Sequence, residues 1–248
     1  MNKKPRPYKK EHSTSYIGSA YPVMELLRVK PEVVEVIYVH SAFIDNCGLT
    51  KLCQQHNIPV VGSDKIFRSL KQKDNVYVLG VFRKFKCSLS SQEPHIVLVN
   101  PSDMGNVGTI IRAAVGFGIY NVAVITPAAD IYHPKTIRAS MGALFLINHR
   151  LFNDFHDYIK EYSNHKVFPF MLAGNTTCEE VSPCLFSLVF GNESSGLGDE
   201  FATIGEPIRI PVSNQVDSLN LSIAAGIGMH IFASKNGLID IHVTPSGE

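Results

Sequence analysis

The last third of the sequence concentrates glycines, side-chain amides and small hydroxyls in three short stretches. They are Gly191 to Leu197, Ile210-Pro211 and Ser218 to Ser222. Amides and hydroxyls donate and accept hydrogen bonds without carrying charge, and glycine lets a ligand come close to the backbone. A backbone-lined pocket for a small polar cofactor needs these residue types, so we predict such a pocket here.

This pocket is expected at the end of a strand. The apolar run Leu185 to Phe190 predicts a buried strand that leads directly into Gly191, and open α/β sheets bind ligands outside the carboxyl ends of their strands. Asn106 and Arg112 lie on a predicted helix that follows the apolar strand 95–99, and we expect both to point toward the same edge. An arginine among apolar helix neighbours is also typical of a paired structural residue.

Three other kinds of site fit the sequence less well. Gly105 and Gly108 read G-x-x-G and lack the G-x-G-x-x-G pattern of a dinucleotide-binding turn. The run from Gly191 to Gly196 reads G-N-E-S-S-G, which differs from the G-x-S-x-G pattern of serine hydrolases. The ten histidines include no H-x-x-x-H pair, so we expect no metal.

Charge is distributed unevenly along the 248 residues, although the formal net charge is only +1. Residues 1–90 hold 15 Lys and Arg against 7 Asp and Glu, whereas the remaining 158 residues hold 8 against 15. A basic first part indicates contact with a polyanion such as RNA, although a basic tail on an ordinary soluble domain would give a similar count.

The cysteines and the apolar runs bear on location. Five cysteines are odd in number and form no C-x-x-C pair, which favours reduced thiols in the cytoplasm. No apolar run approaches the ~18 residues of a membrane span. The basic start, Met1 to Lys10, lacks the apolar core of a secretory signal. We therefore expect a cytoplasmic protein with no membrane partner.

Strand and helix patterns alternate along the chain and predict two α/β domains. We expect a basic mobile arm over residues 1–15, a small α/β domain over 16–87, a Ser-rich linker over 88–94 and a larger domain over 95–248. In the first domain, strands are predicted at 33–39, 58–61 and 76–82, and helices at 21–29, 49–56 and 64–70. In the second, strands are predicted at 95–99, 122–125, 144–148, 167–172 and 185–190. A helix with its apolar face between Ile110 and Phe117 is predicted to end at Gly118, and further helices are predicted at 154–162 and about 219–233. This alternation predicts a mostly parallel sheet covered by helices on both faces.

Three segments of the second domain together resemble the three motifs of the SpoU/TrmH branch of the SPOUT methyltransferases. They are Asn100 to Gly118 (N-P-S-D-M-G-N-V-G-T-I-I-R-A-A-V-G-F-G), Leu188 to Gly198 (L-V-F-G-N-E-S-S-G-L-G) and Ile210 to Ala225 (I-P-V-S-N-Q-V-D-S-L-N-L-S-I-A-A). Residues 138–143 are similar to the small-residue segment that the family has between its first two motifs. Residues 16–87 resemble, by their layout, the L30e-type substrate-binding domain of many members.

The resemblance implies a fold, a cofactor and a partner. The fold would hold a deep trefoil knot in the C-terminal sheet, a feature that periodicity alone argues against because knots are rare. The cofactor would be S-adenosyl-L-methionine and the partner a second copy of the chain, with active sites that draw on both subunits. Carried over by position, the cofactor-binding residues would be Leu188, Gly191, Asn192, Ile210, Ser218, Leu219 and Asn220. The catalytic and substrate-binding residues would be Asn106, Arg112, Glu193, Ser218 and Asn220.

The reaction that the family implies is methylation of a ribose 2′-hydroxyl in RNA. This hydroxyl must lose its proton, or its developing negative charge must be stabilised, before it attacks a sulfonium methyl group. A guanidinium is a poor base because its pKa lies above ~12. We therefore expect Arg112 to orient a phosphate and stabilise the oxyanion, with proton abstraction as the alternative. Glu193 either takes part in the chemistry or only ties loops together.

One position departs from the family pattern, because Ser195 stands where members usually have glycine. A side chain there would have to accept the backbone conformation that glycine adopts. We expect a small local difference in the cofactor site.

The sequence thus predicts an S-adenosylmethionine-dependent ribose 2′-O-methyltransferase acting on structured RNA, with ribosomal RNA favoured over transfer RNA. A non-catalytic RNA-binding protein with a degenerate knot domain is the alternative. Methylation of a protein or small molecule is disfavoured by the basic first part of the chain.

Overall fold

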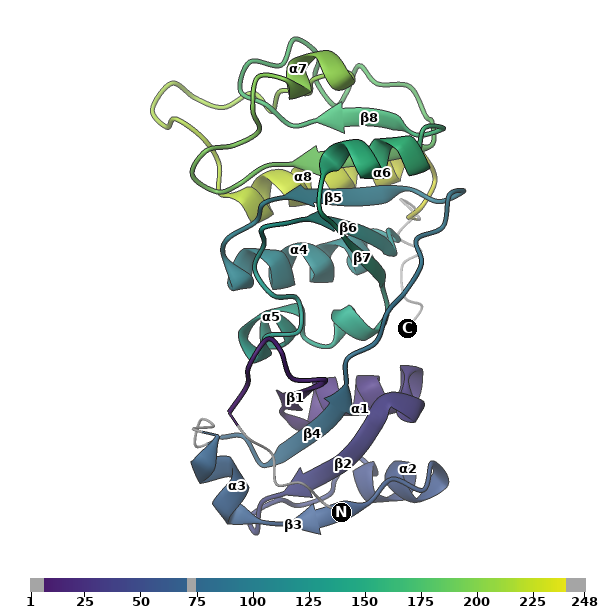
Figure 1. Cartoon of the computed structure of the whole chain (residues 1–248), viewed down its shortest axis with the longest axis vertical. Helices are drawn as coiled ribbons and strands as arrows, with labels where there is room; N and C mark the ends of the chain where they lie inside the picture. Colours follow the sequence, from purple (N-terminus) through teal and green to yellow (C-terminus); the bar gives the residue numbers. More distant parts are fainter. Residues whose placement is uncertain (1–6, 71–74, 240–248) are drawn as a thin grey trace, which may run out of the picture. The chain divides into compact units, whose positions relative to one another are not determined.

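The computed structural model of the chain describes residues 7–70 and 75–239 (Figure 1). Two compact units make up the chain. The N-terminal unit comprises Met1–Lys86 together with Asp130–Leu146, and the C-terminal unit comprises Cys87–Ala129 together with Ile147–Glu248. Residues 130–146, which the sequence placed in the second domain, therefore pack with the first.

The N-terminal unit contains a four-stranded mixed sheet in the order β1-β4-β2-β3. Its strands are β1 (Thr14–Gly18), β2 (Val34–Val39), β3 (Val60–Gly62) and β4 (Val78–Arg83). β4 is antiparallel to β1 and β2, and β2 is parallel to β3. The expected small α/β domain is thus present, with one strand more than the sequence predicted.

Helices cover both faces of this sheet. They are α1 (Ala20–Val29), the 3-10 turn η1 (Pro31–Val33), α2 (Leu49–Gln55) and α3 (Asp64–Ser69). Ile66 and Phe67 of α3 pack against Val36 and Leu79 on one face. On the other face, Val23 of α1 converges with side chains from β1 and β2 over Gly80, which has no side chain to obstruct them.

The inserted segment 130–146 carries α5 (Pro134–Ser140) and the 3-10 turn η2 (Ala143–Phe145). Tyr132 anchors it, because its hydroxyl accepts a hydrogen bond from Phe85 N at 3.0 Å and its carbonyl accepts one from Ser15 Oγ at 2.6 Å. The Phe145 ring meets the Phe82 ring edge-on, with centroids 5.1 Å apart. Aromatic packing thus makes this segment part of the N-terminal unit's core.

The described part of the predicted arm, residues 7–15, is built into the N-terminal unit. Thr14–Gly18 forms β1, and Tyr8 donates a hydrogen bond to Asp130 of the inserted segment. Burial and this carboxylate raise the pKa of Tyr8 above its usual value. The prediction missed β1 because its buried face carries the polar Ser15 beside Ile17, so the strand shows no apolar alternation. The part of the predicted arm over residues 1–6 lies outside the described residues.

The C-terminal unit contains a five-stranded sheet in which every neighbouring pair is parallel, in the order β7-β6-β5-β9-β8. The strands are β5 (His95–Val99), β6 (Asn121–Ile125), β7 (Asn148–Phe152), β8 (Lys166–Pro169) and β9 (Phe186–Phe190). The helices are α4 (Met104–Gly116), α6 (Phe155–Glu161), α7 (Phe201–Ile204) and α8 (Leu221–Lys235). The predicted parallel α/β sheet is confirmed. From β7 the chain crosses to the opposite edge of the sheet as β8 and then forms β9, which lies between β8 and β5.

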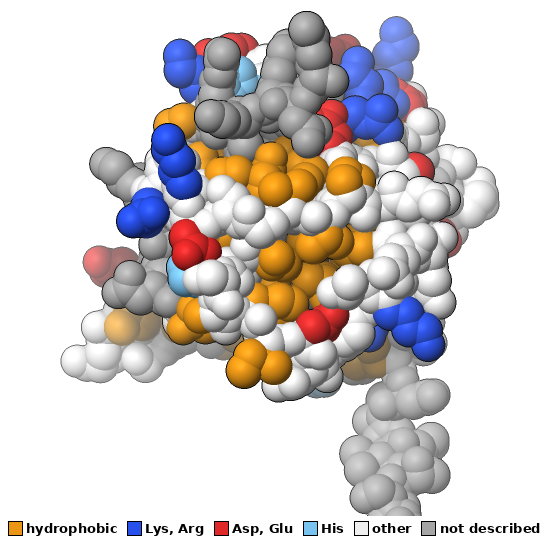
Figure 2. Space-filling view, turned by 90° about the horizontal axis from the view of Figure 1, so that it is seen from below, with side chains coloured by type: hydrophobic (Ala, Val, Ile, Leu, Met, Phe, Trp, Pro, Cys, Tyr) orange, Lys and Arg blue, Asp and Glu red, His pale blue; other side chains and the backbone are white. Residues whose placement is uncertain are grey.

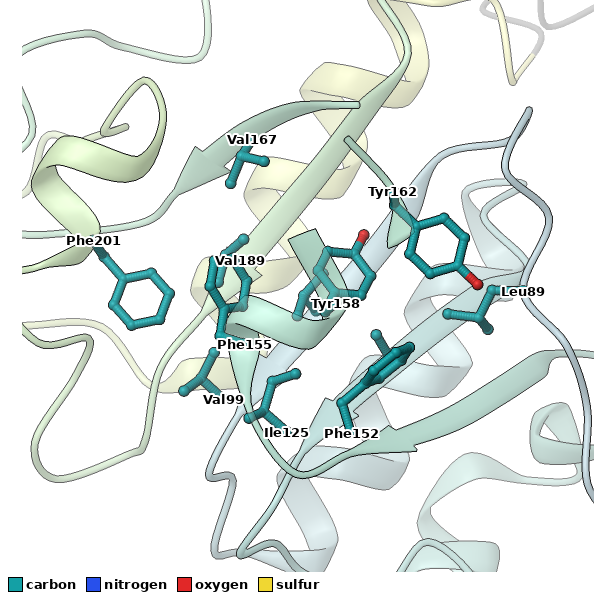
Figure 3. Packing of buried hydrophobic residues seen from close by; sticks show 12 residues of the cluster. Leu89, Val99, Ile125, Phe152, Phe155, Tyr158, Tyr162, Val167, Val189 and Phe201 are labelled. Carbon is teal, nitrogen blue, oxygen red and sulfur yellow. The ribbon is translucent and has the colours of Figure 1, made fainter. Parts of the chain in front are cut away.

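Both faces of this sheet are apolar because successive side chains of each strand point to opposite sides. Val97 and Val189 face the cluster that α6 covers, which Figure 3 shows with Phe155, Tyr158 and Phe201 packed over the strands. The opposite face holds Phe168 and Phe186, whose rings contact Phe232 of α8 at 4.9 and 5.1 Å between centroids. α8 also contacts α4.

One predicted strand is wrong. The apolar run 144–148 suggested a strand, but Ala143–Phe145 forms a 3-10 turn and β7 begins at Asn148. Met141 and Gly142 adopt left-handed backbone conformations just before the run, with φ of 51° and 92°. The chain therefore turns here, and the apolar side chains are buried by the turn rather than by a strand.

A buried polar chain closes the amino-terminal edge of this sheet. The His95 Nδ1 lies 2.8 Å from the Tyr158 hydroxyl, which lies 2.6 Å from Ser187 Oγ, which lies 2.9 Å from His165 Nδ1. The His95 Nε2 donates to Ser90 O at 2.8 Å. Burial lowers the pKa of His95 to about 4 and also lowers the pKa of His165, so both rings are neutral near pH 7.

No helix in the described ranges is long and apolar enough to cross a membrane.

Candidate active site

The carboxyl edge of the C-terminal sheet gathers three segments that are far apart in the sequence. The loop after β5 leads into α4, the loop after β9 spans residues 191–197, and residues 210–220 lead into α8. Because β5 and β9 are neighbouring parallel strands, the first two loops meet at the carboxyl edge of the sheet, where open α/β sheets bind ligands.

The loop after β9 is a tight, self-bonded turn. Asn192 and Gly196 exchange backbone hydrogen bonds of 3.1 and 2.9 Å, and the Asn192 side-chain oxygen accepts from the backbone of Ser194 at 2.9 Å. A Cβ on Gly191 would lie 2.2 Å from the Gly196 carbonyl carbon, so only glycine fits at the end of β9. Gly196 has a φ of +68°, the left-handed conformation that glycine adopts without strain.

Asn192 also joins this loop to the loop after β5. Its side-chain NH₂ donates to Asn100 O at 2.8 Å. Asn100 itself has a φ of 50°, an uncommon conformation for a residue with a side chain, which asparagine tolerates better than most. The left-handed residue turns the chain out of β5 toward α4.

Glu193 is the centre of a second set of contacts. Its carboxylate accepts hydrogen bonds from Ser102 N at 2.9 Å, Ser102 Oγ at 2.7 Å, Asp103 N at 2.9 Å and the Asn106 side-chain NH₂ at 3.2 Å. Partial burial alone would raise the pKa of this carboxyl, but the hydrogen bonds from Ser102 and Asp103 outweigh it and lower the pKa to about 2. Glu193 is therefore an ionised acceptor, not an acid, at neutral pH.

Asn106 extends these contacts to the third segment. Its side-chain oxygen accepts from the Asn220 side-chain NH₂ at 3.2 Å. Asn220 is the N-cap of α8, and its own side-chain oxygen accepts from Ser222 N at 2.9 Å. Glu193, Asn106 and Asn220 thus form one hydrogen-bonded line across all three segments.

A pocket of about 360 Å³ opens between the loop after β9 and the segment before α8. Its size lies within the usual range for ligand sites, roughly 300–1,000 Å³. One side is apolar and the other consists of backbone and small polar groups. The lining residues are Phe170, Met171, Leu172, Ala173, Phe190, Gly191, Asn192, Glu193, Ser194, Ser195, Gly196, Leu197, Asp199, Ile208, Ile210, Val212, Ser218, Leu219, Leu221 and Ala224. The described residues contain no group of His, Cys, Asp or Glu that could hold a metal ion.

Comparison with known proteins identifies the family of this unit. Residues 93–230 match the model of the SpoU rRNA methylase family, a span of more than half of the chain. The chain belongs to the SpoU rRNA methylase family. The three segments that line the site lie within the matched residues, as the motif resemblance implied.

Individual relatives extend the similarity over different lengths. The 23S rRNA (adenosine(1067)-2′-O)-methyltransferase of Streptomyces azureus is 25% identical over 244 residues, covering 93% of this chain and 90% of that protein. The ribosomal RNA small subunit methyltransferase G 2 of Syntrophobacter fumaroxidans is 33% identical over 141 residues, which cover 57% of this chain but only 27% of that longer protein. A third relative, the 23S rRNA (uridine(2479)-2′-O)-methyltransferase of Streptomyces viridochromogenes, is matched over only 48% of its length.

Solved structures of SpoU-type enzymes share the fold of the whole chain. An rRNA methyltransferase from Sinorhizobium meliloti, with bound AdoMet, superposes with a TM-score of 0.76 at 22% identity, covering 92% of this chain and 89% of that one. The SpoU methyltransferase AviRb from Streptomyces viridochromogenes gives a TM-score of 0.79 at 18% identity, with 90% of each chain covered. The small α/β unit in front of the SpoU unit is therefore part of the shared architecture.

Most of the residues predicted for the site lie together in this SpoU-family chain. Gly191, Asn192, Glu193, Ile210, Ser218 and Leu219 line the pocket. Asn106 and Asn220 do not line it, but they bond to each other and Asn106 bonds to Glu193.

Two predicted residues lie elsewhere. Leu188 is fully buried in β9, where it pairs with Ile96 and Phe168, and it does not line the pocket. Phe190, two residues further along the same face, lines the pocket instead. Arg112 is exposed on α4, outside the pocket, and within the described ranges it makes no ion pair. Within residues 7–70 and 75–239, the structure gives Arg112 no ion-pair partner of the kind that a paired structural arginine would have.

The sequence analysis missed one wall of the pocket. Phe170, Met171, Leu172 and Ala173 follow β8, whose carboxyl end meets the same sheet edge. The signal was available, because the run 167–172 was predicted as a strand of the parallel sheet. It was missed because the prediction placed the strand's end at Leu172, three residues beyond Pro169, where β8 ends.

Ser195 requires no strained backbone. Among the described residues, the loop's left-handed conformation falls on Gly196, not on Ser195. The side chain of Ser195 is exposed at the pocket.

Proposed function

We propose that this SpoU-family protein transfers a methyl group from S-adenosylmethionine to a ribose 2′-hydroxyl of ribosomal RNA. The observation that carries the proposal is the line of hydrogen bonds Glu193–Asn106–Asn220 beside a pocket of cofactor size. The names and structures of the relatives support it, since they include 23S rRNA 2′-O-methyltransferases and an AdoMet-bound enzyme of the same fold.

The pocket fits a cofactor that binds through backbone groups. Gly191 comes so close to Gly196 that a side chain would obstruct the pocket edge, which leaves the backbone accessible. We propose that Gly191, Asn192, Ile210, Ser218 and Leu219 hold the cofactor, while Phe170 and Phe190 supply an apolar wall. The bound S-adenosylmethionine would supply the electrophilic sulfonium methyl group.

Asn106 and Asn220 would position the ribose. The Asn220 side-chain NH₂ donates a hydrogen bond to the Asn106 side-chain oxygen, so both side chains are fixed in orientation. Glu193 would act indirectly, because its carboxylate is saturated by donors from Ser102, Asp103 and Asn106. We therefore favour the loop-tying role of Glu193 over a direct one.

Arg112 would bind the RNA and would not contact the cofactor inside the pocket. An exposed guanidinium without an ion pair among the described residues is available to a phosphate. Stabilisation of the phosphate and of the developing oxyanion needs only this positive charge, whereas proton abstraction would need a neutral guanidine.

The excess of Lys and Arg in residues 1–90 supports RNA contact by the N-terminal unit, which would act as an L30e-like substrate-binding domain. On the face seen from the side of β3, these basic side chains stand at separate points around a hydrophobic centre (Figure 2). Positive charges that are spread over a surface can bind several phosphates of a folded RNA, whereas a single cluster of charges would bind the RNA at one place.

The path of the chain after β9 supports a trefoil knot. Residues 206–209 are hydrogen-bonded to β8 through Glu206 N to Val167 O at 2.9 Å, and to the loop that follows β8 through Arg209 N to Thr176 O at 2.8 Å. Ile208 bridges to both Phe170 and Thr176. A later segment held between β8 and the loop that follows β8 is an arrangement that a threaded chain requires.

A homodimer is supported by the composition of α8. This helix is apolar around its whole circumference, which is typical of helices buried on all sides. Yet Ile223 is 54% exposed, and Ile227 and Ile231 follow it at intervals of four residues. We propose that a second copy covers this stripe and that its active site draws on both subunits.

The cysteines support a cytoplasmic location. All five lie in the described ranges as free thiols, as expected in a reducing compartment.

Two measurements test the proposed function. Calorimetry with S-adenosylmethionine should detect binding to the purified protein, and ribose-methylation mapping should find one rRNA position that loses its methyl group when the gene is deleted. RNA binding without cofactor binding would instead support the non-catalytic RNA-binding alternative. A change confined to tRNA would contradict the assignment to ribosomal RNA.

A further inference from the structure

Gly228, in the middle of α8, lies directly against the ring of Phe170. A Cβ at this position would be 2.5 Å from Phe170 Cζ and 2.8 Å from Cε1. Glycine in a helix interior is unfavourable relative to alanine. The contact supplies a packing reason for it, because alanine would force the ring to move.

The pocket is open space into which the Phe170 ring can move. The Phe170 backbone is fixed, since its N–H donates to Val189 O at 2.9 Å and the residue bridges to Ile208. The ring stacks on Phe190 with centroids 4.5 Å apart and planes inclined by 29°. α8 lies behind Phe170, Phe190 lies beside it, and the pocket is the remaining open space, because Phe170 and Phe190 both line it.

From this geometry we infer that Gly228 is a positioning residue for the pocket. By letting Phe170 lie back against α8, it keeps the apolar wall out of the space that a ligand would occupy. The inference rests on the proposed function, since it takes the pocket as the cofactor site. Gly228 does not itself line the pocket and acts only through Phe170.

Substitution at Gly228 should therefore alter binding more than folding. The clashing atom is the far end of a side chain, which can rotate, so the backbone of α8 need not shift. The added methyl group pushes the ring by about 1 Å, the difference between 2.5 Å and an ordinary carbon–carbon contact of about 3.5 Å.

The test is calorimetric titration of S-adenosylmethionine into the full-length wild type, Gly228→Ala, Phe170→Leu and the double variant. We expect Gly228→Ala to raise Kd by about tenfold, a typical size for a mild overpacking effect. Phe170→Leu removes the distal ring atoms, so in that background Gly228→Ala should change Kd by less than about twofold. In an assay with rRNA, KM for the cofactor should rise while kcat changes little.

Gly116→Ala is the matched control. It adds the same methyl group to α4, where nothing in the described structure lies within 4 Å, so its Kd should equal that of the wild type. An unchanged Kd for Gly228→Ala, or an equal loss in the Phe170→Leu background, would overturn the inference.

Crystal structures of the ligand-free wild type and Gly228→Ala separate this inference from the proposed function. A Phe170 ring displaced into the pocket supports it even if the pocket binds a different ligand, and an unmoved ring refutes it. Absence of S-adenosylmethionine binding by the wild type counts against the proposed function alone. If Gly228→Ala does not fold, Phe170→Leu must restore folding in the double variant, and failure to do so also overturns the inference.

Discussion

Asn106 donates a hydrogen bond from its side-chain NH₂ to the Glu193 carboxylate at 3.2 Å, across 87 residues of sequence. The same carboxylate accepts two backbone N–H groups from the loop after β5. The Glu193 side chain thus fixes the start of α4. It also fixes the orientation of Asn106, which in turn bonds to Asn220 at the start of α8. The rigidity of the site depends on the charge of Glu193, since a carboxylate offers acceptors only.

Glu193→Gln tests this dependence. The amide places an NH₂ group opposite backbone donors, so at least one hydrogen bond is lost and one N–H is left unpaired. We expect a loss of about 2 kcal/mol in the free energy of unfolding, a fall in Tm of about 4–8 °C. The Kd for S-adenosylmethionine should also rise.

Glu206→Gln is the matched control, because Glu206 is exposed and lies outside the pocket. Differential scanning calorimetry of both variants gives the comparison. Equal melting temperatures for the two would contradict the role assigned to Glu193.

Arg112→Lys distinguishes phosphate and oxyanion stabilisation from proton abstraction. Lysine retains the charge but not the planar fork of donors, so kcat should fall by about tenfold or more while the pH dependence keeps its shape. A pH–rate profile under saturating cofactor measures this. Retention of most of the activity with a shifted basic limb would support proton abstraction, and Arg150→Lys, on the surface away from the pocket, should behave as the wild type.

Ile223→Glu tests the proposed dimer. Burying a carboxylate in an apolar interface is strongly unfavourable, so sedimentation should report a monomer. Methyltransferase activity should fall with it if the site draws on both subunits. Ile204→Glu, on α7 with 37% of its side chain exposed, makes the same change at another surface position and should leave the mass unchanged.

Acid should destabilise the C-terminal unit through His95. Its pKa is lowered from 6.5 to about 4 by burial, so below pH 6.5 the unfolded chain binds a proton that the folded chain does not. Stability from this group is complete above pH 6.5 and is lost as the pH falls toward 4, by about 3 kcal/mol in total. His165, whose pKa is also lowered, adds to the same trend.

Urea unfolding of His95→Gln at pH 4.5 and pH 7.5 measures this contribution. The variant should be less stable than the wild type at pH 7.5, because Tyr158 and Ser90 lose their partner, but its stability should change less between the two pH values. Exposed His156→Gln serves as the control. A wild-type stability that does not change between these pH values would contradict the prediction.

Ser195→Gly should be nearly neutral. The sequence suggested strain at this position, but the left-handed conformation falls on Gly196, so glycine at 195 relieves nothing. We expect a change in unfolding free energy within about 1 kcal/mol, on the destabilising side because glycine adds backbone freedom to the unfolded chain. A clear gain in Tm would show that Ser195 is strained after all.

The sheet of the C-terminal unit was readable from sequence because its strands are buried on both faces. Such strands appear as continuous apolar runs, and 95–99 was placed without error. The same signal failed at 144–148, where an apolar run is buried by a turn. An apolar run in the sequence indicates that the residues are buried. It does not indicate whether a strand or a turn buries them.

The site was predictable where chemistry is concentrated in few residue types. The place of the pocket was predicted because glycines, side-chain amides and small hydroxyls cluster in residues 191–197 and 218–222, and both segments contribute to its lining. Ser102, which gives Glu193 two of its donors, has no distinctive neighbours and depends on a contact 91 residues away. Leu188 lies on the same face of β9 as Phe190 but two residues further from the end of the strand, and motif position alone does not show how far along a strand the pocket reaches.

The insertion of residues 130–146 into the N-terminal unit has a consequence for synthesis on the ribosome. Phe82 is completely buried, and its ring partners Tyr132 and Phe145 lie about 50 to 60 residues later in the chain. At translation rates of roughly 5–20 residues per second, the first 86 residues wait several seconds for these partners. The N-terminal unit is thus completed only after the first strands of the SpoU unit have been made, so the order of folding cannot follow the order of the sequence.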